Sequence, residues 1–219
     1  MEIRKELLEK FEDLIGDSVV VDEKLALYLL IIDERPGVLI MDPDFDDRKK
    51  LKDFCREYDL EFHYTGGEGK RGLKDRLLGT DSRMFKGGFF ICREKDQIKK
   101  LKQSEGRFYG FSDQGVGDFL GYPEDDIEYF SGNVTKGHIE KPTRDKAEEL
   151  VSDKTIRKDD LKYLELVSYV PRPEKENILE AIETGKHRHE KIEEIDKKYE
   201  VKTGKKLLRK LFRDPLYLT

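Results

Sequence analysis

The acidic run MDPDFDD, residues 41–47, is the first stretch whose residue types and spacing could do chemistry. It ends an apolar segment, GVLIMD, that is predicted to be a buried strand. Ligands of open α/β folds usually bind at the carboxyl edge of a parallel sheet, and carboxylates clustered there could hold Mg²⁺. The same acids also suit the first turn of a following helix, as caps and partners of the helix dipole. We favour capping, predict no metal site, and keep three of these acids as candidate ligand-binding residues: Asp42, Asp44 and Asp46.

A second candidate lies in the glycine-rich stretch GFSDQGVGDFLGYPEDDIEYF, residues 110–130. A serine and an aspartate near its start can cap a helix, and Gly121 suits the left-handed position that commonly ends one. Pro123 is well placed as the first residue of a second helix, and the acids after it suit that helix's first turn. The stretch therefore predicts a helix–corner–helix over residues 112–131.

Two glycines inside the first of these helices need a separate explanation. Gly115 and Gly117 each cost about 1 kcal/mol relative to alanine in a helix interior. They indicate a close backbone approach, either by another element of the chain or by a ligand. A dinucleotide fingerprint would require a third glycine where Leu120 stands, so that interpretation is poor. Packing is the favoured explanation, and we keep Asp113, Gly115 and Gly117 as candidate ligand contacts.

The pattern F-S-D-x-x-V-G-x-F-L-G-Y-P-x-D at residues 111–125 resembles the signature stretch of an uncharacterised archaeal family, the domain of unknown function 483 family. The C-terminal third shows a more general likeness to the same family. No reaction is assigned to the family, so the resemblance implies no catalytic residue and no cofactor.

A third candidate is the basic segment KTGKKLLRKLFR near the end of the sequence. It contains no acid, and its leucines and phenylalanine form an apolar face. Such a helix can dock on the protein's own body, on nucleic acid or on a membrane surface. We favour intramolecular docking and place nucleic acid second. The six cations are Lys202, Lys205, Lys206, Arg209, Lys210 and Arg213.

The histidines and cysteines of the sequence show no catalytic or metal-binding spacing. His187 and His189 lie two residues apart on a predicted helix, so their side chains point about 200° apart and cannot share a metal ion. The apolar stripe of that helix predicts a partly buried His189 and an exposed His187. Cys55 and Cys92 are predicted to be buried reduced thiols, which fits a cytoplasmic protein.

The elements that must position these residues follow from hydrophobic periodicity. Helices are predicted at residues 2–15, 22–34, 44–58, 94–106 and 174–199. Strand signals occur at residues 37–42, 60–65, 88–93 and 163–173, with a further one at 107–111.

The alternation of strands and helices predicts an α/β or α+β fold. We expect a mixed, partly parallel sheet of four to five strands with surrounding helices and a helical C-terminal third. Residues 1–131 would form the core and residues 132–160 a polar linker or excursion. Residues 161–219 would add a strand and C-terminal helices packed on the core.

Composition narrows the class of protein further. The chain has 219 residues, of which 36% are apolar and 42% charged, and its net charge is −5. The longest apolar run, residues 25–32, is far shorter than the roughly 18 residues that span a bilayer. A soluble cytoplasmic protein is therefore expected. One hypothesis is that it binds a small molecule or anion in an α/β crevice; the alternative is an interaction protein whose basic C-terminal helix binds nucleic acid or a protein partner.

Overall fold

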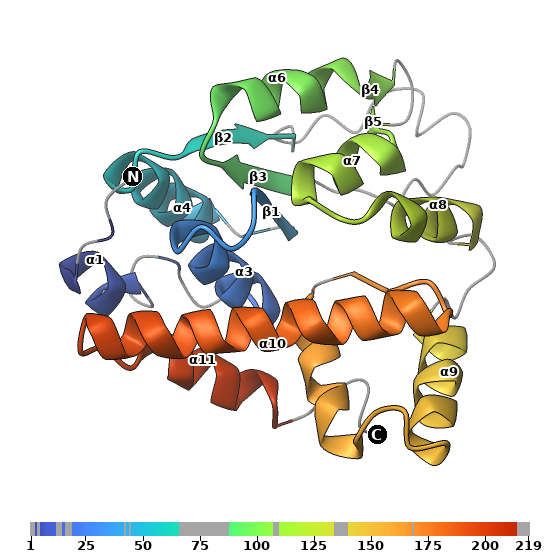
Figure 1. Ribbon diagram of the computed structural model, residues 1–219. Coiled ribbons are helices and arrows are strands. Elements are labelled where there is room, and N and C mark those ends of the chain that lie inside the picture. Colours follow the sequence, from blue (N-terminus) through green and yellow to red (C-terminus); the bar gives the residue numbers. More distant parts are fainter. Residues whose placement is uncertain are drawn as a thin grey trace.

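The computed structural model (Figure 1) describes most of the chain, and helices make up most of what it describes. The described residues are 3, 5–11, 15, 19–41, 43, 45–65, 88–106, 110–133, 140–167 and 169–213.

A small antiparallel sheet replaces the predicted mixed sheet of four to five strands, so that prediction is wrong. Its strands are β1 (Gly37–Met41), β2 (Glu61–Tyr64) and β3 (Gly88–Cys92), in the order β1-β3-β2. Both outer strands pair with β3 in the antiparallel sense. The central strand is buried along its whole length, as its sequence GFFIC requires.

The error in the predicted sheet has a specific origin. Because β1 and β2 are both antiparallel to β3, they point in the same direction, and the helix α4 (Phe45–Glu57) connects them as a crossover would. The sequence pattern predicts that crossover but not the strand inserted between its two ends. Two short strands, β4 (Glu105–Gly106) and β5 (Gly110–Phe111), form a separate antiparallel sheet.

The predicted helices before residue 131 are confirmed, with shorter bounds. The first predicted helix, 2–15, contains α1 (Lys5–Glu9), and residues 12–14 lie outside the described part. The apolar run forms α3 (Val21–Ile31), which is buried on nearly every side and ends before Asp33, a residue with φ of 71°. The helix α6 (Lys95–Gln103) follows β3.

The helix–corner–helix is confirmed as α7 (Asp113–Leu120) and α8 (Glu124–Asn133). The side-chain oxygen of Ser112 accepts a hydrogen bond from the Gly115 backbone N–H at 3.1 Å. Gly121 ends α7 in the left-handed conformation with φ of 73°. Capping, corner and second helix therefore follow the residue types that predict them.

The C-terminal third contains helices and no strand within its described residues. The helix α9 (Glu140–Ser152) lies in the segment predicted as a polar linker or excursion. The strand predicted at 163–173 is wrong, because a 3₁₀-helix, η2 (Lys158–Leu166), occupies its first half. Leu161, Leu164 and Val167 are buried at three-residue intervals, which is the period of a 3₁₀-helix rather than of a strand.

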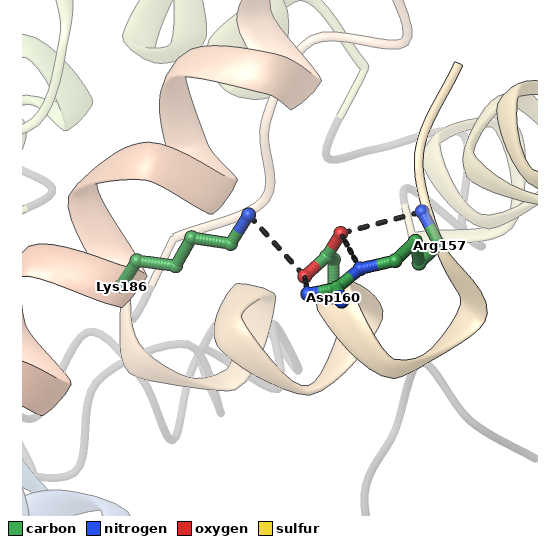
Figure 2. A network of polar contacts seen from close by, with 3 residues as sticks. All are labelled: Arg157, Asp160 and Lys186. Carbon is green, nitrogen blue, oxygen red and sulfur yellow. Dashed lines mark hydrogen bonds and ion pairs between the residues drawn. The ribbon is translucent and has the colours of Figure 1, made fainter.

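A polar network fixes the start of η2 (Figure 2). The Asp160 carboxylate, almost fully buried, accepts a hydrogen bond from the Arg157 backbone N–H at 3.3 Å. It also forms ion pairs with the guanidinium of Arg157 and the ammonium of Lys186, both at 3.2 Å. Burial raises the pKa of Asp160, but hydrogen bonds from Arg157 and Lys186 outweigh it and hold the pKa below its ordinary value.

The helices α10 and α11 connect the C-terminal third to the rest of the protein. The helix α10 (Lys175–Lys198) crosses the molecule and contacts α9, η2 and α11 (Thr203–Leu211), as Figure 1 shows. One apolar core lies between α9, η2 and α10. The largest core joins α3, α4, the sheet, α10 and α11, with Phe11 and Phe54 in edge-to-face contact at 5.9 Å. The helices α10 and α11 are thus part of the main core.

Candidate functional site

The last two acids of the acidic run, Asp46 and Asp47, lie at the start of a helix. Asp46 is exposed in the first turn of α4, where the helix dipole stabilises a carboxylate. Asp47 is buried and lies 3.6 Å from the ammonium of Lys50. Asp42 and Asp44 lie outside the described residues. Since the sheet is antiparallel, the expected crevice at a parallel strand edge does not form there.

Close contacts within the chain account for both unexplained glycines of α7. A Cβ atom on Gly115 would lie 2.0 Å from the Ser104 Oγ atom, and one on Gly117 would lie 2.6 Å from the Ile127 Cδ1 atom. The predicted close approach is confirmed, and the approaching groups are side chains of α8 and of the residue that ends α6. Asp113 is exposed in the first turn of α7.

The basic C-terminal segment forms α11, whose apolar face docks on the rest of the protein. Leu207, Leu208 and Leu211 are buried in the main core, where α11 contacts α3 and α10. The prediction of intramolecular docking is therefore confirmed for the apolar face.

A buried carboxylate sets the position of α11. The Oδ1 atom of Asp196, near the end of α10, accepts hydrogen bonds from the Tyr28 hydroxyl at 2.8 Å and the Gly204 N–H at 3.1 Å. Its Oδ2 atom accepts one from the Lys205 N–H at 2.9 Å. The Thr203 hydroxyl donates to the Leu8 carbonyl at 2.8 Å. The first turn of α11 is thus tied to α3, α10 and the N-terminal segment.

The opposite face of α11 is cationic and exposed. The six cations named above recur at intervals of three and four residues, which places them on one side of a helix. All six residues are exposed; four of them lie within α11, and Lys202 and Arg213 lie just beyond its ends. The Lys205 ammonium lies 3.9 Å from the Glu193 carboxylate of α10. We call this surface the cationic face of α11.

An aromatic cluster borders the cationic face at its C-terminal end. The rings of Tyr163 and His189 lie 5.6 Å apart, and those of His189 and Phe212 lie 6.2 Å apart. The Lys162 ammonium lies 5.0 Å from the centre of the Tyr163 ring and 5.9 Å from that of Phe212. Burial lowers the pKa of His189, because the charged imidazolium loses hydration.

Sequence reasoning predicts a partly buried His189 and an exposed His187, and both predictions are confirmed. It misses Lys162 and Tyr163 as neighbours of the cationic face. They belong to η2, whose last residues fall in the segment predicted as a strand, 163–173, and no local signal connects residue 163 to residue 212. Cys55 and Cys92 are buried free thiols, as predicted.

Comparisons with family models, curated proteins and solved structures found no match to this chain. The resemblance of residues 111–125 to the domain of unknown function 483 family stays a prediction. No helix in the described part of the chain has both the length and the apolar character needed to cross a bilayer. The described residues also contain no cluster of three or more His, Cys, Asp or Glu side chains that could hold a metal ion.

Proposed function

We propose that the protein binds nucleic acid through the cationic face of α11, by contacts to the phosphate backbone. The observation that supports this most is the exposure of all six cations on a helix whose apolar face is already buried in the core. Lysine and arginine contacts to phosphates supply most of the affinity of sequence-independent nucleic-acid binding.

The docking of α11 supports nucleic acid over a membrane surface as the partner of this helix. Insertion into a membrane surface needs the apolar face of an amphipathic helix, and here Leu207, Leu208 and Leu211 are occupied inside the protein. The surface of α11 that is still open to a partner is the cationic one, so we expect a partner that carries negative charge. The partly exposed rings of Tyr163 and Phe212 at the end of the face favour nucleic acid over an acidic protein, because bases stack on aromatic side chains.

The length of the face fits a few phosphates. Residues 202 and 213 are separated by about 16 Å along a helix at 1.5 Å per residue. One strand of a duplex carries a phosphate about every 3.4 Å, so the face spans roughly five of them. If all six cations displace counterions from duplex DNA, the logarithm of the affinity should fall with the logarithm of salt concentration with a slope of about −5.

Fluorescence anisotropy with a labelled RNA single strand and a labelled DNA duplex, at 50 and 200 mM salt, tests the proposal. The test variant replaces four exposed cations by glutamine: Lys205, Lys206, Arg209 and Lys210. The matched control replaces four exposed lysines of α4 and α6: Lys49, Lys52, Lys100 and Lys102. Substitution is preferable to deletion of residues 202–219, because deletion would uncover the core beneath α11.

The expected result is a salt slope of about −2 in the test variant, since two cations remain, and an unchanged slope in the control. Affinity should fall at least tenfold at 50 mM salt only in the test variant. Equal losses in the two variants, or no binding by the unmodified protein at 50 mM salt, would refute the proposal.

A further inference from the structure

The aromatic cluster at the C-terminal end of the cationic face bears on which form of nucleic acid the protein binds. It consists of Tyr163 of η2, His189 of α10 and Phe212, which directly follows α11. The ring planes of His189 and Phe212 are inclined by 20°, and those of Tyr163 and His189 by 82°. All three residues are partly exposed, so the cluster forms part of the protein surface.

Two lysines lie close to these rings. The Lys162 ammonium lies 5.0 Å from the centre of the Tyr163 ring and 5.9 Å from that of Phe212. The Lys186 ammonium lies 5.8 Å from the Tyr163 ring, but it is also paired with the carboxylate of Asp160 at 3.2 Å. No carboxylate in the described part of the chain forms an ion pair with Lys162. Lys162 therefore adds a cation beside the end of the cationic face.

Two acids of α10 also lie near the cluster. Burial has the largest effect on the pKa of His189 and lowers it; the charges of Glu193 and Glu190 raise this pKa, and those of Lys162 and Lys205 lower it. Glu193 is already paired with Lys205, at 3.9 Å. Since the six cations of the adjoining face outnumber the two acids, the surroundings of the rings still favour a polyanion.

The combination of rings and cations distinguishes single strands from duplexes. In a duplex the faces of the bases are covered by their neighbours, so a side chain reaches them only after a base leaves the stack. In a single strand, a base can stack on an aromatic ring while the adjoining phosphates contact lysine and arginine. Phe212 is the ring best placed for this, because Arg209, Lys210 and Arg213 lie within three residues of it.

We propose that the protein prefers single-stranded nucleic acid and that an unpaired base stacks on Phe212. The phosphates on either side of that base contact Lys162 and the cations of α11. This inference rests on the proposed function, because the phosphate contacts supply most of the affinity. Every base has an aromatic face, so the site should accept any sequence.

Fluorescence anisotropy at 50 mM salt, with three labelled DNA molecules of equal length, separates the contribution of the bases from that of the phosphates. The three are an ordinary single strand, an abasic single strand that keeps the phosphates, and the blunt duplex of the ordinary strand. The unmodified protein should bind the ordinary strand about fivefold or more tightly than the abasic strand, the lower end of what one base–aromatic stack contributes. It should also bind that strand more tightly than the duplex. Equal binding of the ordinary and abasic strands would overturn the proposal.

A matched pair of variants tests the role of the ring. Phe212→Leu keeps an apolar side chain against the core and removes the aromatic face, so it should weaken binding of the ordinary strand about fivefold or more and leave the other two molecules unaffected. Phe130→Leu changes an exposed aromatic residue of α8 and should bind all three normally. An equal loss for the ordinary and abasic strands in Phe212→Leu would mean that the ring only holds α11 in place, and the proposal would be wrong.

Photochemical cross-linking of the unmodified protein gives a test that does not depend on a folded variant. A single strand that carries 5-iodouracil is illuminated in complex with the protein, and the attached residue is identified by mass spectrometry. We expect a cross-link at Phe212. Cross-links found only at other residues would overturn the assignment of the base to this ring.

The two proposals fail in different ways. If no DNA molecule binds at 50 mM salt, the proposed function is refuted and this inference with it. If the ordinary strand, the abasic strand and the duplex bind equally, and the variant that replaces four cations of α11 still weakens all three, the phosphate contacts stand and only the stacking is refuted.

Discussion

The strongest single prediction concerns Asp196, because its carboxylate joins three elements in the interior. Asp196→Ala removes hydrogen bonds to the Tyr28 hydroxyl and to the backbone N–H groups of Gly204 and Lys205. Tyr28 is fully buried and Gly204 almost so, so water cannot replace the lost acceptor for either group. The Lys205 N–H is only partly buried and can find water.

Asp196→Ala leaves those two buried donors without an acceptor. A buried donor left without its partner costs about 1–3 kcal/mol, so the free energy of unfolding should fall by about 2–6 kcal/mol. For a chain of this size, each kcal/mol corresponds to a drop in melting temperature of about 2–4 °C. Asp196→Asn keeps an acceptor oxygen but turns an amide N–H₂ toward one donor, so its loss should be smaller.

Urea unfolding followed by far-ultraviolet circular dichroism measures this free energy. Lys197→Ala, an exposed substitution at the next position of α10, is the control and should change stability by no more than about 0.5 kcal/mol. If Asp196→Ala and Lys197→Ala unfold within 1 kcal/mol of each other, roughly the value of one hydrogen bond, the carboxylate does not hold the helices together as argued.

Three further predictions test other parts of the packing, and two of them have a matched control substitution. Gly185→Ala should destabilise by about 1–3 kcal/mol in urea unfolding, because its Cβ would lie 2.1 Å from a backbone oxygen. Gly132→Ala, with nothing within 4 Å, should be neutral or stabilising. Burial lowers the folded-state pKa of His189 below the unfolded value of about 6.5, so stability that is present above that pH should be lost as the pH falls. The variant His189→Gln should therefore lose less stability than the unmodified protein between about pH 7.5 and 5. Asp160→Ala should cost about 1–2 kcal/mol at pH 7, against almost nothing for exposed Asp159→Ala.

The local elements could be predicted where the residue types alone determine the backbone. The corner between α7 and α8 is the clearest case, because Gly121 adopts the left-handed conformation that its position predicts. The sheet could not be predicted in the same way. A crossover of suitable length is compatible with adjacent parallel strands and equally with a strand inserted between them, and the partner of each strand is decided by distant residues.

The candidate sites also differ in whether local sequence reveals them. The cationic face of α11 could be found from its sequence, since charge and helical period are local properties. The aromatic cluster beside it could not, because Tyr163, His189 and Phe212 lie in separate parts of the sequence and no local pattern connects them. A signal for such a site exists only in the three-dimensional arrangement.

The way α11 is held bears directly on how its charges can act. A flexible basic tail would lose conformational freedom on binding a rigid partner, at roughly 0.5–1.5 kcal/mol for each side chain immobilised and more for the backbone. Here Asp196 caps the helix and the buried leucines fix its orientation, so the backbone cost is met when the protein folds. The backbone positions that carry these cations are therefore fixed before any partner binds. That arrangement favours recognition of a regular row of charges, such as a phosphate backbone, over a scattered set of acids on a protein surface.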